Sequence, residues 1–210
     1  MNRYIILFLL FSPLFLQAQV FDYKIEGTIL NPENNKFAYL VIDSLPDLER
    51  QRYVSPIVAN KFTFKGKTDL NGWLFRTGMI YLGEDSIRSE QSVSESMLMR
   101  RVVGRGLVIE NLTIDIDKEG NINEAKVEGT ELNRDHFALK RSVKTGKIDE
   151  FIKSHLDSPL SAYYLKILLK LESKMMIEYS GAENLFNMLS LRIKNSKEGR
   201  LLAAEIEKTK

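Results

Sequence analysis

Val127-Glu128-Gly129-Thr130-Glu131-Leu132-Asn133 is the stretch at which the chain changes its pattern. Before it, apolar and polar residues alternate with a period of two, which is typical of half-buried β-strands. After it, apolar residues recur every three to four positions, which is typical of amphipathic helices. Gly129 therefore separates a strand-rich part from a helical part, and the sequence predicts an α+β protein.

The part before Gly129 contains about eight short candidate strands. Alternation is cleanest over residues 21–27 and 61–66, while Pro56 indicates an edge strand or a bend. The predicted strands cover residues 21–27, 36–42, 52–58, 61–66, 74–82, 107–111, 112–117 and 125–128. Many short strands separated by Gly, Asn and Asp favour an antiparallel β-sandwich or a partly closed barrel. The polar, serine-rich residues 86–96 are expected to form an exposed loop.

The part after Gly129 is predicted to be a set of helices that pack on one another or on a sheet, because short helices are not stable alone. Ser158-Pro159 is a strong helix start, since a serine hydroxyl can cap free backbone N–H groups and proline suits the first helical position. Helical periodicity covers residues 132–143, with an end near Gly146, and residues 148–156, 159–168, 185–193 and 201–206.

The first nineteen residues, MNRYIILFLLFSPLFLQAQ, have the build of a secretory signal peptide: a basic start, an apolar centre and a small residue near a cleavage point. The alternative, a retained membrane anchor, would need an uninterrupted run of ~20 apolar residues. We therefore expect residues 1–19 to be a signal peptide, 20–129 a β-sandwich-like domain and 130–210 a helical segment. The expected location is the periplasm, with secretion as the alternative.

Composition narrows the classes of function. The chain has 210 residues, no cysteine and a formal net charge of +2. So balanced a charge does not suggest nucleic acid as a partner. Without cysteine there can be no disulfide, CxxC redox pair, thiolate metal site or lipid-modified cysteine. No segment of the mature chain is long and apolar enough to span a membrane.

Several short motifs follow one another in a characteristic order. They cover residues 21–27, 61–66, 108–114, 127–133, 151–152 and 157–162. Their order and spacing resemble a domain of unknown function in exported proteins of Gram-negative bacteria, where it precedes a TlpA- or AhpC/TSA-type thioredoxin-like domain. Within that resemblance, Gly129-Thr130-x-x-Asn133 corresponds to the junction into the helices. The thioredoxin-like domain of the family carries redox cysteines, and this sequence has none.

The resemblance implies an exported, non-catalytic binding or interaction module of the bacterial cell envelope, with no cofactor. Its expected partner is another envelope protein, and a thioredoxin-like protein is one candidate. The alternative is the accessory half of a split or truncated thiol–disulfide reductase system, selecting substrates or promoting dimerisation. A structural role at the cell surface is a third hypothesis.

Two patterns resemble sites but fit poorly. Residues 115–124 match the opening of a calcium-binding loop, but Lys126 stands where a bidentate glutamate is required. A β-hairpin with its turn at residues 118–121 is therefore the favoured interpretation. His136 and His155 have Asp135 and Asp157 beside them, which suggests a metal or acid–base site. Because no HxxxH or HExxH spacing is present, we expect surface histidines and no catalytic or metal-binding residue.

The remaining candidates for a partner-binding surface are Arg100, Arg101, Arg105 and Trp73. The arginines form the densest basic cluster and suit an anionic group, such as a peptide carboxylate, a polysaccharide acid or a lipid A phosphate. The alternative is a solvated strand edge, where positive charge discourages aggregation. Trp73 follows Asn71-Gly72 and is expected to be partly exposed and to contact a partner.

Overall fold

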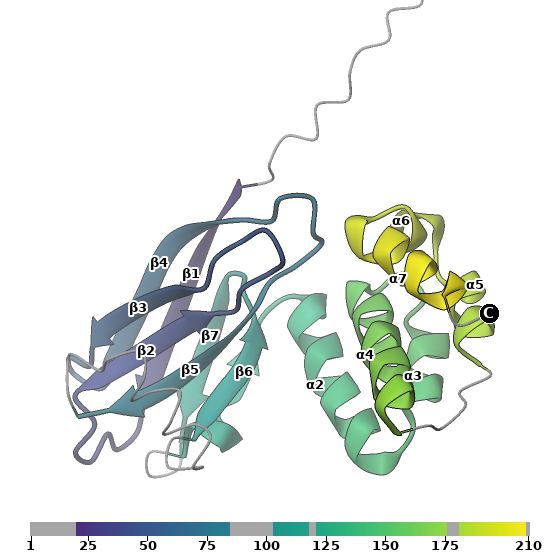
Figure 1. Cartoon of the computed structure of the whole chain (residues 1–210). Coiled ribbons are helices and arrows are strands. Elements are labelled where there is room, and N and C mark those ends of the chain that lie inside the picture. Colours follow the sequence, from purple (N-terminus) through teal and green to yellow (C-terminus); the bar gives the residue numbers. More distant parts are fainter. Residues whose placement is uncertain (1–19, 85–102, 118–120, 176–180, 209–210) are drawn as a thin grey trace, which may run out of the picture.

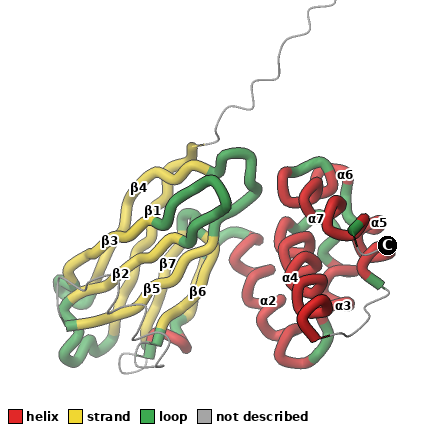
Figure 2. The backbone as a smooth tube through the Cα atoms, in the orientation of Figure 1, coloured by secondary structure: helices red, strands yellow, loops and turns green. Residues whose placement is uncertain are grey.

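The structure is a computed structural model that describes residues 20–84, 103–117, 121–175 and 181–208 (Figure 1). The expected signal peptide, the serine-rich residues 86–96, and Arg100 and Arg101 lie outside these ranges. Within them, strands occupy the N-terminal part and helices mainly the C-terminal part, so the protein is α+β (Figure 2).

Within the described ranges, eight strands form two four-stranded sheets. The first has the order β4-β1-β7-β8, with β1 (Val20–Ile29), β4 (Lys61–Asp69), β7 (Leu112–Ile116) and β8 (Lys126–Glu128). The second has the order β3-β2-β5-β6, with β2 (Phe37–Ile42), β3 (Gln51–Pro56), β5 (Thr77–Gly83) and β6 (Gly104–Val108). Among these eight strands, only β1 and β7 pair in parallel. Because the two sheets are separate, the strands do not close into a barrel.

Both sheets contribute side chains to one apolar core. On β1 the period of two directs Tyr23 and Ile25 inward, and Phe62 and Phe64 on β4 follow the same rule. The second sheet contributes Leu40 from β2 and other buried residues to the same cluster. Pro56 ends β3, which is an edge strand, as its missing N–H donor requires.

Six α-helices and one 3-10 helix lie within the described ranges. Their bounds are η1 (Ile122–Glu124), α2 (Glu131–Thr145), α3 (Ile148–Ser154), α4 (Pro159–Met175), α5 (Ala182–Met188), α6 (Leu191–Lys194) and α7 (Lys197–Glu207). Their apolar faces form a second core, which also contains Phe75 and Val108 from the strand-rich part. In Figure 1, α2 lies beside β6 and joins the two parts. None of the helices within these ranges could cross a membrane.

The junction at Gly129 is held by polar contacts to β6 and the residues after it. Asn133 accepts a hydrogen bond from the Val108 N–H and donates one to the Val108 carbonyl, both at 2.9 Å. It thus occupies the free edge of β6 as a neighbouring strand would. Thr130 caps α2 and also bonds Glu110. A Cβ at position 129 would lie 2.5 Å from Glu110 Oε1 and would displace this carboxylate from its bonds to Thr130 and Asn133.

Three local expectations are corrected by the structure. Strand β6 begins at Gly104, three residues earlier than predicted, because its pairing with β5 extends over two glycines. The Ser158 hydroxyl does not cap α4, since it has no hydrogen-bond partner. The single helix expected over residues 185–193 is two, α5 and α6, because Leu189 is extended and the Ser190 hydroxyl caps α6.

Candidate functional site

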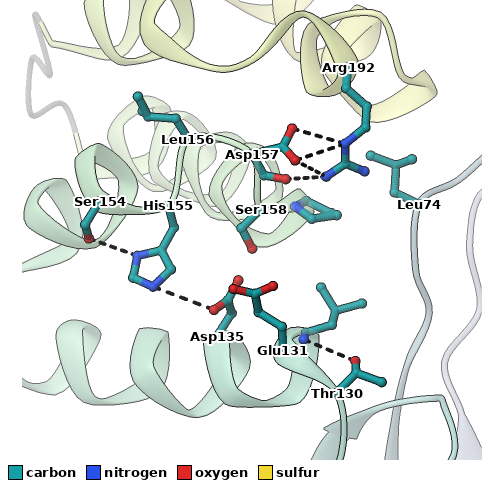
Figure 3. A pocket seen from close by; sticks show the side chains of 12 residues that line it. Leu74, Thr130, Glu131, Asp135, Ser154, His155, Leu156, Asp157, Ser158 and Arg192 are labelled. Atoms are coloured by element: carbon teal, nitrogen blue, oxygen red, sulfur yellow. Dashed lines mark hydrogen bonds and ion pairs between the residues drawn. The ribbon is translucent and has the colours of Figure 1, made fainter.

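A groove of about 630 Å³ lies where the start of α2 faces the α3–α4 connection (Figure 3). The strand-rich part contributes Leu74 to its wall, and α6 contributes Arg192. The remaining lining residues come from α2 and its cap, and from the segment between α3 and α4. They are Thr130, Glu131, Leu132, Asp135, Ser154, His155, Leu156, Asp157, Ser158 and Pro159. The groove is therefore built from segments far apart in the sequence.

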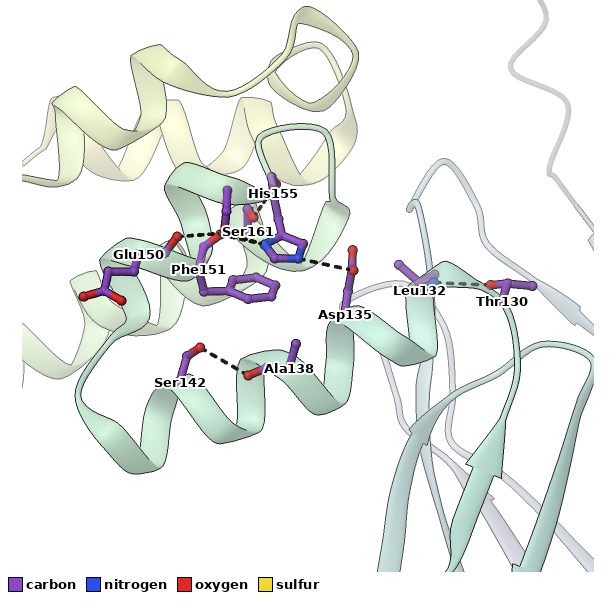
Figure 4. A network of polar contacts seen from close by, with 10 residues as sticks. Thr130, Leu132, Asp135, Ala138, Ser142, Glu150, Phe151, His155 and Ser161 are labelled. Atoms are coloured by element: carbon purple, nitrogen blue, oxygen red, sulfur yellow. Dashed lines mark hydrogen bonds and ion pairs between the residues drawn. The ribbon is translucent and has the colours of Figure 1, made fainter.

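His155 is held in one orientation at the end of α3 (Figure 4). Its ring stacks on Phe151 with 4.1 Å between centroids, and its Nδ1 lies 2.9 Å from the Phe151 carbonyl oxygen. Because a carbonyl only accepts, this contact places a proton on Nδ1. The other ring nitrogen, Nε2, then faces the groove and lies 3.6 Å from Asp135 Oδ1.

Ser154, His155 and Asp135 form a row that superficially resembles a hydrolase triad. Ser154 Oγ lies 2.9 Å from His155 Nδ1, but it also lies 2.8 Å from the Glu150 carbonyl and 2.9 Å from that of Phe151. Its proton is therefore used within the helix. In addition, the last turn of a helix presents carbonyl oxygens, which repel a developing oxyanion rather than stabilise it. The row orients the imidazole and does not activate a nucleophile.

Asp157 is neutralised by Arg192 at the other end of the groove. The guanidinium of Arg192 contacts both carboxylate oxygens, and Nη2 lies 3.0 Å from Oδ2 (Figure 3). These bonds, and secondarily one from Ser190, hold the pKa of Asp157 below its usual range. The pair links the α3–α4 connection to α6 and leaves little net charge there.

Asp135 and Ser158 are incompletely bonded by contrast. Asp135 is 9% exposed, and its long contact with His155 exceeds hydrogen-bond length. Ser158 is 7% exposed, and its hydroxyl has no partner. In Figure 3 the Ser158 hydroxyl points toward the space beside Asp135 and Glu131. A carboxylate and a hydroxyl left in this state can both accept hydrogen bonds from a bound cation.

The two histidines do not occupy the positions expected from the sequence. His136 is 8% exposed, so the expectation of a surface residue is wrong for it, and it does not pair with Asp135. Successive residues of a helix point about 100° apart, so Asp135 faces the groove while His136 faces β6. Asp135 pairs instead with His155, whose side chain is 32% exposed. The sequence analysis named both histidines and both aspartates, but it did not predict that Asp135 pairs with His155.

Trp73 is buried rather than partly exposed, so that expectation is wrong. It is 4% exposed, and its indole Nε1 donates to Asp47 Oδ1 at 2.9 Å. Lys197 of α7 bonds the same carboxylate and lies 5.2 Å from the Trp73 ring centroid. Lys197 first, and then Trp73, holds the pKa of Asp47 below its usual range. Trp73 thereby contributes to the attachment of α7 to the strand-rich part.

Arg105 lies on the edge strand β6, and the structure places it against α2. Its guanidinium lies 4.3 Å from the centroid of the Phe137 ring, and Nη1 bonds the Asn123 carbonyl. Burial lowers its pKa. Arg105 and Trp73 lie in different parts of the fold, and neither lines the groove. The other two predicted arginines, Arg100 and Arg101, lie outside the described ranges.

No group of three or more His, Asp or Glu side chains in the described ranges is placed to hold a metal ion. Comparison with protein-family models, with curated proteins and with solved structures finds no match. The sequence offers Asp135, His155 and Asp157 as members of a possible metal or acid–base site, but it does not predict that they line one groove. Glu131 and Arg192 carry no signal of a site in the sequence, and Ser158 is predicted only as a helix start.

Proposed function

We propose that the protein is a non-catalytic binding module of the bacterial cell envelope whose groove takes a basic side chain of a partner protein. The observation that carries the proposal is the state of Asp135, a nearly buried carboxylate with one long contact, beside the unpartnered hydroxyl of Ser158. An ammonium group between them would supply the missing hydrogen-bond donors.

The charge of the groove supports a cationic ligand. Arg192 is paired with Asp157, whereas Glu131 and Asp135, four residues apart on α2, have no paired cation other than His155 among the lining residues. The α2 side of the groove therefore carries an excess of negative charge. Complementary charge favours both encounter with, and orientation of, a basic side chain.

The proposed location is supported by the signal-peptide-like sequence of residues 1–19 and by the family resemblance of the residues that follow. A β-sandwich-like arrangement of the two sheets would present the groove on a rigid support, because both sheets share one core. A binding role is preferred to hydrolysis because the Ser154 hydroxyl is committed to helix carbonyls. In addition, Ser154 lies at the C-terminal end of α3, where backbone carbonyl oxygens are exposed and no N–H donors are available to stabilise the oxyanion of an acyl transfer.

Calorimetric titration with Nα-acetyl-lysine amide tests the proposal, with the norleucine analogue as the uncharged comparison. We expect saturable binding of the lysine compound only, weakened about tenfold or more by Asp135→Asn, because that variant removes a charge-assisted bond. Asp22→Asn is the matched control, since Asp22 is an exposed carboxylate on β1. Equal binding of both compounds, or equal affinity in both variants, would refute the assignment of the groove.

Crosslinking in intact cells tests the envelope partner. A photoreactive residue at Leu156, which lines the groove, should capture one partner reproducibly, and the same residue at the exposed Leu30 should not. Mass measurement of the purified protein should show that about nineteen N-terminal residues have been removed. Capture of a CxxC-bearing thioredoxin-like protein would favour the accessory role in a thiol–disulfide system. An uncleaved chain confined to the cytoplasm would contradict export.

A further inference from the structure

A second group of polar side chains lies between β6 and α2, away from the groove. It consists of Arg105 on β6 with His136 and Lys140 on α2, and we call it the β6–α2 basic cluster. Gly106 lies at its centre: a Cβ there would be 3.2 Å from Lys140 Nζ and 4.0 Å from His136 Nε2. The absence of a side chain at Gly106 therefore lets Lys140 Nζ and His136 Nε2 approach the strand, and the Gly78 carbonyl oxygen lies 3.9 Å from the same point.

Within the part of the chain that the structure describes, the positive charges of the cluster are not paired with a carboxylate. None of the ion pairs within the described ranges involves Arg105, His136 or Lys140. Burial lowers the pKa of Lys140, and the charges of Arg105 and Lys144 lower it further. Burial, and then the charge of Lys140, lowers the pKa of His136 to about 4. Partly desolvated like charges are costly unless an anion joins them.

Two nitrogens in the cluster are buried without a hydrogen-bond partner of ordinary geometry, Nε of Arg105 and Nε2 of His136, although the Gly106 carbonyl lies close enough to His136 to raise its pKa slightly. His136 is itself more than nine-tenths buried. Such groups are rare in folded proteins because each loses its hydration without compensation. A bound anion is one arrangement that would supply the missing acceptors.

The backbone of β6 adds a further donor. Both the N–H and the carbonyl of Val108 are directed at α2, where they bond Asn133. Residues two apart on a strand direct these groups to the same side, so the Gly106 N–H also faces the cluster. The Gly106 carbonyl lies on that side as well and partly opposes the lowering of the His136 pKa.

We propose that the β6–α2 basic cluster binds a phosphate group, with Lys140 and Arg105 neutralising its charge and the Gly106 N–H available as a backbone donor. Phosphate suits the cluster because its oxygens point in several directions, as the donors on β6 and α2 do. A single carboxylate would reach fewer of them. The site is independent of the groove, and either proposal can fail alone.

The test is a titration of the ¹⁵N-labelled protein with inorganic phosphate at constant ionic strength, followed by NMR. We expect saturable shifts at the Gly106 amide and the His136 ring, and a dissociation constant at least about tenfold higher in Lys140→Gln. Gly106→Ala should weaken binding by shifting Lys140 Nζ, which would lie only 3.2 Å from the added Cβ. Lys153→Gln, which removes the same charge from an exposed position on α3, is the matched control and should bind as the wild type does.

Unsaturable shifts, or equal affinity in Lys140→Gln and Lys153→Gln, would overturn the proposal. If Gly106→Ala does not fold, the comparison of Lys140→Gln with Lys153→Gln still decides the outcome. A second arm uses sedimentation with phosphatidylcholine vesicles that contain phosphatidic acid. Lys140-dependent binding to these vesicles, stronger than to inorganic phosphate, would identify a lipid headgroup as the source. Binding to inorganic phosphate alone would identify a free anion.

Discussion

Two buried titratable groups should give the stability of this protein opposite dependences on pH. Burial lowers the pKa of His136 from 6.5 to about 4, and the charges of Lys140 and Arg105 act in the same direction. Burial raises the pKa of Glu198 from 4.5 to about 7, against the opposing influences of Lys166 and the Leu74 backbone. Both side chains prefer to be neutral in the folded protein.

The direction of each pH dependence follows from whether the folded protein or the unfolded chain binds the proton more tightly. Between pH 4 and 6.5 the unfolded chain protonates His136 and the folded protein does not, so the free energy of unfolding falls as the pH falls. Between pH 4.5 and 7 the folded protein keeps the Glu198 proton that the unfolded chain loses, so the free energy of unfolding falls as the pH rises. Each full change is equivalent to about 3 kcal/mol, of which roughly 2 kcal/mol lies between pH 5 and 7.5.

In the wild-type protein these two contributions nearly cancel, and single substitutions should expose them. Relative to the wild type, Glu198→Gln should gain roughly 2 kcal/mol between pH 5 and 7.5 because the variant has no proton to lose. His136→Gln should lose a similar amount over the same range. The test is how the difference in free energy of unfolding between variant and wild type changes with pH. A difference that is the same at every pH reflects altered packing instead.

Urea denaturation at half-unit steps of pH is the measurement, and the double variant is the control, because its difference from the wild type should be nearly independent of pH. Asp47 and Asp157, whose pKa values are lowered, titrate below this range and do not interfere. If the stability differences of Glu198→Gln and His136→Gln from the wild type changed with pH in the same direction, or did not change at all, the assignment of two buried, neutral groups would be refuted.

Three further predictions concern the junction and the buried tryptophan. Trp73 is the only tryptophan, so blue-shifted fluorescence that resists acrylamide is expected, and quenching as efficient as that of a free indole would contradict its burial. Asn133→Leu should cost about 2–4 kcal/mol in urea denaturation, because it leaves the Val108 N–H and carbonyl unpaired, whereas Asn187→Leu at an exposed position should cost little. Gly129→Ala should destabilise the protein by about 1–3 kcal/mol through its clash with Glu110, and a double-mutant cycle with Glu110→Ala should show a smaller cost.

Periodicity located most of the elements correctly because burial on one face imposes it directly. The alternation in β1 and β4 and the helical spacing in α2 each correspond to a buried face in the structure. Periodicity is misleading where one local contact overrides the pattern. Apolar spacing continues from α5 into α6, yet Ser190 interrupts the helix by capping α6, with its own N–H bonded to the Leu156 carbonyl. Such a distant partner cannot be read from the local sequence.

The candidate sites were harder to predict because they depend on direction as well as on composition. Asp135 and His136 are neighbours in sequence, and the helix directs one to the groove and the other to β6. Arg105 was identified from its basic neighbours, but its contacts with α2 could not be anticipated. Trp73 was misjudged because the turn residues before it suggested exposure, whereas Asp47 and Lys197 enclose its ring.

By itself, the sequence determined the types of element, the change from strands to helices at Gly129 and the absence of thiol chemistry, since each follows from local residue pattern or composition. Only the tertiary structure decided which side chains meet. The junction stretch 127–133 shows both: its glycine and threonine mark a helix start, but the reason for Gly129 and Asn133 is the approach of Glu110 and Val108. Those contacts join residues about twenty positions apart, and the folding of β6 against α2 alone brings them together.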